Sequence, residues 1–133
     1  DILIENIKKV GNKGCKILIT FINGYEIFNK LKNAKYEIYF SKEPVYGVYK
    51  YNENIPNTFN NNIKMLFYFK DIYGLSNGSE EYLVNPEYLI EKFSDFKLVT
   101  KNNFLNIKEN NFNFKFNFQK EILKLNQLLI FEI

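Results

Sequence analysis

The 133-residue sequence contains no histidine, no arginine and no tryptophan, and its only cysteine is Cys15. Without histidine, the side chain that most often transfers protons near neutral pH and binds zinc is missing. A single cysteine cannot form an internal disulfide, and after a glycine turn we expect Cys15 to be a small core residue. Serine–histidine triads and histidine–cysteine zinc sites are therefore excluded. We expect no metal site and assign no catalytic side chain.

The positive charge of the chain is carried by lysine alone, and the formal net charge is +3. Arginine's planar guanidinium reads guanine edges and phosphates with two hydrogen bonds at once, whereas lysine acts as a point charge. Any phosphate contact must therefore come from a lysine. The lysines are spread along the chain from Lys8 to Lys124 instead of forming one block, a pattern more typical of a solvated surface than of a nucleic-acid patch.

Composition predicts a folded chain, because 46% of the residues are apolar and 18% are aromatic. The length fits a single domain over residues 1–133. No apolar run reaches the length of a membrane span, and residues 1–5 lack the basic-then-apolar layout of a secretory signal. We therefore expect a soluble, intracellular protein with no membrane partner.

Apolar spacing in the first third of the chain alternates between helix and strand. Residues 2–10 have helical spacing, with Ile2, Ile4, Ile7 and Val10 expected on one face. The nearly continuous apolar run 16–22 predicts a strand covered on both faces in a parallel sheet. A short helix over 25–31 and a strand over 36–40 should follow.

The rest of the chain adds more strands and one clear helix start. Residues 46–51 and 63–69 predict a hairpin or meander around a polar loop, 52–62. Pro86 suits the first turn of a helix, and residues 96–100 read as the next buried strand.

Two segments near the end of the sequence complete the pattern. The strict alternation over 112–118 favours an edge strand or an ordered arm. The apolar residues 127–133 predict a terminal strand inserted into the sheet. Together with the earlier segments, they indicate the α/β class.

Five segments, taken in order and with their spacings, resemble the C-terminal half of mRNA cap (guanine-N7) methyltransferases, a class I S-adenosylmethionine-dependent family with eukaryotic and poxvirus-like members. The resemblance implies the C-terminal portion of a Rossmann-like sheet, mostly parallel with an antiparallel last strand, and an inserted antiparallel β segment around residues 36–84. Residues 16–22, 96–100 and 127–133 would be its fifth, sixth and seventh strands. The matching segments are Gly14–Asn23, Tyr46–Gly47, Leu66–Phe69, Glu81–Val84 and Phe96–Val99.

The resemblance also assigns a cap-binding site. It implies that Glu81, in the motif Glu-Tyr-Leu-Val, faces the guanine, and that Phe69 flanks the base, with Tyr82 or Tyr73 as further aromatic surface. Lys64 and Lys70 are candidates for contacts with the cap phosphates.

Several alternatives to these assignments remain open in the sequence. Glu80 competes with Glu81 because neighbouring strand residues face opposite sides. Tyr68 competes with Phe69, which could equally be core. Leu128 stands where the family has an aromatic residue near the start of its last strand.

The cofactor side of the family pattern is not found in this sequence, which contains no G-x-G segment. The resemblance therefore implies that S-adenosylmethionine is bound mainly by residues outside the chain. A protein partner or an N-terminal half would complete the enzyme, which we do not expect to be active alone, and the capped 5′ end of RNA would be the substrate.

Two other functions stay open at this point. The chain could be a noncatalytic methyltransferase-like subunit that stabilises a capping partner, or a small RNA-binding module. The expected location is the nucleus, or the cytoplasm for a viral protein.

Overall fold

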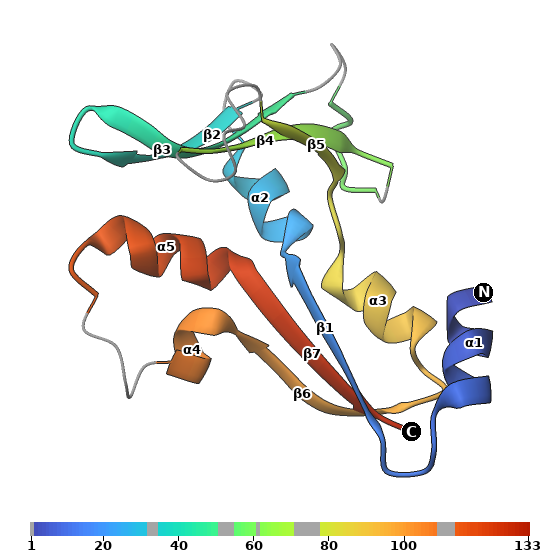
Figure 1. Cartoon of the computed structure of the whole chain (residues 1–133). Helices are drawn as coiled ribbons and strands as arrows, with labels where there is room; N and C mark the ends of the chain where they lie inside the picture. Colours follow the sequence, from blue (N-terminus) through green and yellow to red (C-terminus); the bar gives the residue numbers. More distant parts are fainter. Residues whose placement is uncertain (1, 32–34, 51–54, 61, 71–77, 109–113) are drawn as a thin grey trace.

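The computed structural model describes residues 2–31, 35–50, 55–60, 62–70, 78–108 and 114–133, and it is shown in Figure 1. In this part of the chain the protein is mixed α/β, with one antiparallel sheet of three strands and one of four. The α/β class that the sequence predicts is therefore confirmed.

The three-stranded sheet consists of β1 (Lys16–Ile22), β7 (Asn126–Glu132) and β6 (Lys97–Asn103), in the order β1-β7-β6. The last strand, β7, lies in the middle and is antiparallel to both neighbours. As a result β1 and β6 run in the same direction. The predicted terminal strand inserted into the sheet is confirmed.

One face of this sheet is covered by α1 (Ile2–Val10) and α3 (Pro86–Lys92), which lie on the same side (Figure 1). Alternate residues of β1 and β7 pack against the two helices. Pro86 occupies the first turn of α3, as predicted, and the Asn85 side chain caps that helix by accepting a hydrogen bond from the Glu87 N–H. The buried residues of this core are Ile4, Phe93, Phe96, Leu129 and Phe131.

The opposite face of the sheet is not covered by the described residues. Leu18 of β1 is 64% exposed, and Val99 of β6 is 43% exposed. The prediction of a β1 strand covered on both faces in a parallel sheet is therefore wrong, because its described partner is antiparallel and only Ile17, Ile19 and Phe21 face a helix layer. The prediction of a buried strand over 96–100 is wrong for the same reason.

The four-stranded sheet is a meander of β2 (Lys35–Phe40), β3 (Glu43–Lys50), β4 (Lys64–Phe69) and β5 (Ser79–Tyr82). Its inner face packs on α2 (Gly24–Lys30) and α5 (Asn117–Leu125), which Figure 1 shows on one side of the sheet. The predicted antiparallel segment within residues 36–84 is thus present, and a short helix, α4 (Phe104–Lys108), follows β6.

The expected strand or arm over 112–118 is wrong where the structure describes it, because α5 begins at Asn117. Phe116 and Phe118 stack on each other, and both rings contact Phe40 of β2. The two rings therefore pack between the start of α5 and β2 and do not line one face of a strand. Two smaller predictions also fail. Cys15 is exposed, and α1 buries Ile4 while Ile2 and Val10 stay in solvent.

The two sheets meet at the end of β1. Asn23 forms a parallel bridge with Val84, and the N–H of Gly24 donates a hydrogen bond of 2.8 Å to the Val84 carbonyl. The Asn23 N–H donates to the carbonyl of Leu125, the last residue of α5. These bonds fix the segment that connects β5 to α3 beside the carboxyl end of β1.

Candidate functional site

Glu81 lies on β5, the last strand of the four-stranded sheet, directly opposite Met65 of β4. Directly opposed residues share a face of an antiparallel sheet, and Met65 is fully buried in the core beneath it. Glu81 is therefore on the inner face, where its position on the last strand leaves its side chain exposed. The Ser79 hydroxyl, on the same face, donates a hydrogen bond of 3.3 Å to Glu81 Oε1.

Aromatic rings of β4 share this inner face with Glu81. Phe67 and Phe69 follow Met65 at alternate positions, and both are half-buried. Phe69 is four residues from the position opposite Glu81, about 13 Å along the strand. Phe67 is the diagonal neighbour, at about 7–8 Å between Cα atoms. The ring nearest to Glu81 on β4 is thus Phe67, which the sequence analysis left out of the site because only the strand register identifies it.

Tyr46 of β3 adds a polar group behind these rings. Its ring meets Phe69 edge to face at 5.6 Å, and its side chain is almost completely buried. Among the described residues its hydroxyl has no hydrogen-bond partner. Burial, and secondarily the negative charge of Glu81, raise the pKa of Tyr46, so its hydroxyl stays protonated.

The other predicted residues of β4 and β5 lie on the outer face of the same sheet. Tyr82 is directly opposite Lys64, and the Lys64 Nζ lies 6.0 Å from the centre of the Tyr82 ring. Glu80 forms an ion pair of 2.6 Å with Lys64 on that side. Tyr68, the alternative to Phe69, also faces outward, because it is opposite Gly47 and adjacent to the inward-facing Phe67.

The two remaining predicted site residues are Lys70 and Tyr73. Lys70 directly follows β4, where it forms an ion pair with Glu43. Tyr73 lies outside the described residues. The structure thus brings Glu81 and Phe69 onto one face of the sheet and places Tyr82 and Lys64 on the other.

A cavity of about 400 Å³ lies where α2 and α3 begin, next to the carboxyl end of β1. Ligands of α/β proteins commonly bind at the carboxyl ends of strands, and this volume falls within the usual range of small-molecule sites. Glu87 in its wall forms an ion pair with Lys101. The cavity is lined by Asn23, Tyr25, Glu26, Asn85, Pro86, Glu87 and Lys101.

We expect Gly24→Ala to destabilise the junction that holds this region together. A Cβ atom at Gly24 would lie 2.4 Å from the Val84 nitrogen and 2.7 Å from the Leu83 carbonyl carbon, which are backbone atoms that cannot rotate away. Such overpacking costs about 1–3 kcal/mol in the free energy of unfolding, which urea denaturation measures.

Asn29→Ala is the matched control for Gly24→Ala, because Asn29 lies in the same helix with an exposed side chain. Alanine is the better helix former, so the control should leave stability unchanged or slightly higher. Equal midpoints for the wild type and Gly24→Ala would show that the helix and the Leu83–Val84 segment separate easily.

The described residues contain no cluster of three or more metal-binding side chains. Among the helices of this part of the chain, none combines the length and apolar character that crossing a membrane requires. The sequence matches no protein-family model, and a search against curated proteins finds no significant relative. The site must therefore be interpreted from its own geometry and from the resemblance given above.

Proposed function

We propose that the chain is the cap-guanine-binding part of an mRNA (guanine-N7) methyltransferase, completed by a cofactor-binding half that lies outside it. The proposal rests on the segments that resemble this family and on the position of Glu81. The reaction would transfer the methyl group of S-adenosylmethionine to N7 of the cap guanine.

The single observation that carries the proposal is the position of Glu81 on the inner face of the meander together with aromatic rings. The register that sets Glu81 opposite Met65 also sets Glu80 on the outer face, in an ion pair with Lys64. Of the two candidate carboxylates, Glu81 is therefore the one beside Phe67 and on the face of Phe69. A carboxylate and a flat ring on one surface are the two groups that guanine recognition requires.

The strand arrangement supports the same proposal. The resemblance expects two strands of a mostly parallel sheet and an antiparallel last strand. In the described sheet, β1 and β6 run in the same direction and β7, the last strand, runs against both. The exposed Leu18 and the outer edge of β1 are where further strands and helices would add.

Methyl transfer to the cap guanine requires the protein to recognise the base and to position its N7 atom next to the methyl group. Guanine N7 carries a lone pair, so methyl transfer to it needs no general base, and the lack of histidine is no obstacle. A carboxylate accepts hydrogen bonds from guanine N1–H and the 2-amino group, an arrangement that adenine cannot reproduce. Aromatic stacking on the base adds about 1–3 kcal/mol and tolerates the positive charge of the methylated product.

The glycine turn after β1 gives no support for a cofactor site in the described part of the chain. The turn after β1 is the one strand–glycine–helix turn of the described residues, and the space in front of Gly24 is filled by the backbone of Leu83 and Val84. A ribose has no room to approach the backbone of Gly24. S-adenosylmethionine, which supplies the methyl group, would therefore be held outside this chain.

A noncatalytic subunit is the second candidate function. The uncovered face of the β1-β7-β6 sheet, with Leu18 on the edge strand β1, equally suits a subunit that stabilises a catalytic partner. In that case Glu81 substitutions would leave methyl transfer by the assembled enzyme unchanged, whereas a cap-binding part would lose activity with them.

Calorimetric titration of cap dinucleotides tests the proposal. We expect the chain to bind GpppA at least tenfold more tightly than ApppA, because only guanine offers two donors to Glu81. S-adenosylmethionine should give no binding heat with the chain alone. Equal affinities for the two dinucleotides, or tight binding of S-adenosylmethionine, would contradict the proposal.

A further inference from the structure

The outer face of the four-stranded sheet carries one tyrosine from each strand. Figure 1 shows that α2 and α5 lie on the inner side, and no described helix covers the outer side. Tyr82 is 59% exposed and Tyr39 is 50% exposed, while the other two tyrosines are half-buried. The four residues are Tyr39, Tyr49, Tyr68 and Tyr82.

The Glu37 carboxylate accepts hydrogen bonds from the hydroxyl groups of two of these tyrosines. The Tyr39 hydroxyl donates a hydrogen bond of 2.8 Å to one carboxylate oxygen, and the Tyr49 hydroxyl donates one of 2.9 Å to the other. Lys35 adds an ion pair of 3.0 Å. The bond from Lys35, followed by those from the tyrosines, holds the pKa of Glu37 below its usual range, so the carboxylate stays charged and keeps its partners.

The Tyr49 ring lies across Gly47 on the surface of the sheet. A Cβ atom at Gly47 would come within 2.7 Å of two ring carbons and 2.5 Å of the hydroxyl oxygen of Tyr49. Gly47 is directly opposite Glu37 of β2, so the ring of Tyr49 lies along its own strand with its hydroxyl on the Glu37 carboxylate. Burial, then the hydrogen bond to Glu37, raise the pKa of Tyr49 to about 12. The rings of Tyr39 and Tyr49 are thus neutral, held in place by Glu37 and presented on a β surface.

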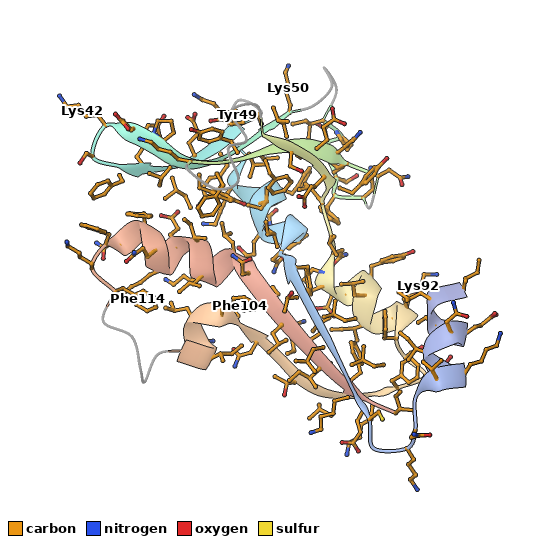
Figure 2. All side chains as sticks on the ribbon, viewed as in Figure 1. Lys42, Tyr49, Lys50, Lys92, Phe104 and Phe114 are labelled. Atoms are coloured by element: carbon orange, nitrogen blue, oxygen red, sulfur yellow. The ribbon has the colours of Figure 1, made fainter. Side chains whose placement is uncertain are left out.

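Lysines stand between and around these rings. Lys35, Lys64 and Lys70 each form an ion pair with a glutamate of the same sheet. The carboxylates that pair with Lys64 and Lys70 are solvent-exposed, and pairs of this kind contribute about 0–1 kcal/mol, so a phosphate can replace the carboxylate at these two lysines at little cost. Figure 2 shows Lys42, in the turn before β3, extending away from α5. The net charge of +3 favours a negatively charged partner.

We propose that this outer face binds single-stranded RNA, with bases stacking on the tyrosines and lysines meeting the phosphates. Aromatic side chains on an open antiparallel sheet are a common platform for unpaired bases, and duplex RNA would keep its bases stacked inside the helix. The surface is separate from the guanine-facing groups. The two sets of residues alternate along β4 and β5, where Phe67 and Glu81 face inward and their neighbours Tyr68 and Tyr82 face outward.

Fluorescence anisotropy with a labelled, uncapped 12-nucleotide single-stranded RNA tests this surface. We expect Tyr39→Ala combined with Tyr82→Ala to weaken binding by at least 25-fold, about fivefold for each stacking ring. Tyr82→Phe keeps the ring and should bind like the wild type. Tyr88→Ala is the matched control, since Tyr88 is an exposed tyrosine of α3 with Lys92 over its ring, away from the sheet. It should bind like the wild type.

Other outcomes overturn the proposal. Equal losses in Tyr88→Ala and the double variant, or no loss in the double variant, would exclude the tyrosine face as the RNA site. A concentration-dependent dimer that the double variant abolishes, in a chain that does not bind RNA, would make the face a protein contact. Failure to bind GpppA with intact binding of uncapped RNA would contradict the cap function and leave this surface standing.

Discussion

Glu81→Gln should lower the affinity of the chain for GpppA by about 10- to 100-fold. A hydrogen bond to a charged group contributes about 1.5–3 kcal/mol, and the amide replaces a two-oxygen acceptor by one oxygen and one donor. The donor would then face the N1–H or the amino group of guanine without a partner. The loss should be specific for guanine, so the preference of GpppA over ApppA should fall with it. Calorimetry on both dinucleotides measures the two effects.

Glu80→Gln is the control for the Glu81 substitution, because it makes the same chemical change one residue away on the outer face, where the carboxylate pairs with Lys64. We expect it to leave GpppA affinity within a factor of two. A larger loss in Glu80→Gln than in Glu81→Gln would mean that the base is read on the outer face, and the assignment of the inner face to guanine would have to be abandoned.

Phe131→Ala should destabilise the chain by about 3–5 kcal/mol. Phe131 is 1% exposed in the middle strand of the three-stranded sheet, and its ring stacks on Phe93 of the helix side at 5.1 Å. Removing it takes away contacts with both β1 and the helix layer and leaves a cavity that the paired strands cannot close. The midpoint and slope of urea denaturation give the change in the free energy of unfolding.

Leu18→Ala is the companion measurement for Phe131→Ala. Leu18 lies in the same sheet on the uncovered face and is 64% exposed, so its truncation should change stability by less than about 0.5 kcal/mol. A cost of several kcal/mol at Leu18 would mean that this face is covered in solution by a second copy of the chain, and sedimentation at several concentrations would then reveal the association.

Much of the secondary structure could be read from the sequence, because local spacing determines it. The apolar run 16–22 gives β1 to the residue, and Pro86 marks the start of α3. The partner of β1 could not be read in the same way, since pairing with β7 is a contact between distant parts of the chain. No helix was predicted where α5 lies, because Phe116 and Phe118 continue a period-two pattern into it and the helix's own apolar signal, from Ile122 to Leu125, comes later.

The candidate site shows the same limit at the level of single residues. The sequence narrows the acidic ligand to Glu80 or Glu81, and a shift of one residue in register exchanges their faces. Only the pairing of Glu81 with Met65 separates them. The same register shows that the β4 ring nearest to Glu81 is Phe67 and not Phe69. It also places Tyr82 and Lys64 on the outer face of the sheet, away from Glu81. Alternation predicts that neighbouring residues lie on opposite faces of the sheet, but it does not predict which of the two faces inward.

The central place of β7 has a consequence for biosynthesis. β1 leaves the ribosome before the backbone partner that the structure gives it, which is made more than a hundred residues later, with Lys16 opposite Glu132. Pairing between such distant segments closes a long loop and is slow. Until β7 has been made, the apolar strand β1 remains without this partner, and nascent chains in this state are exposed to aggregation and depend on chaperones.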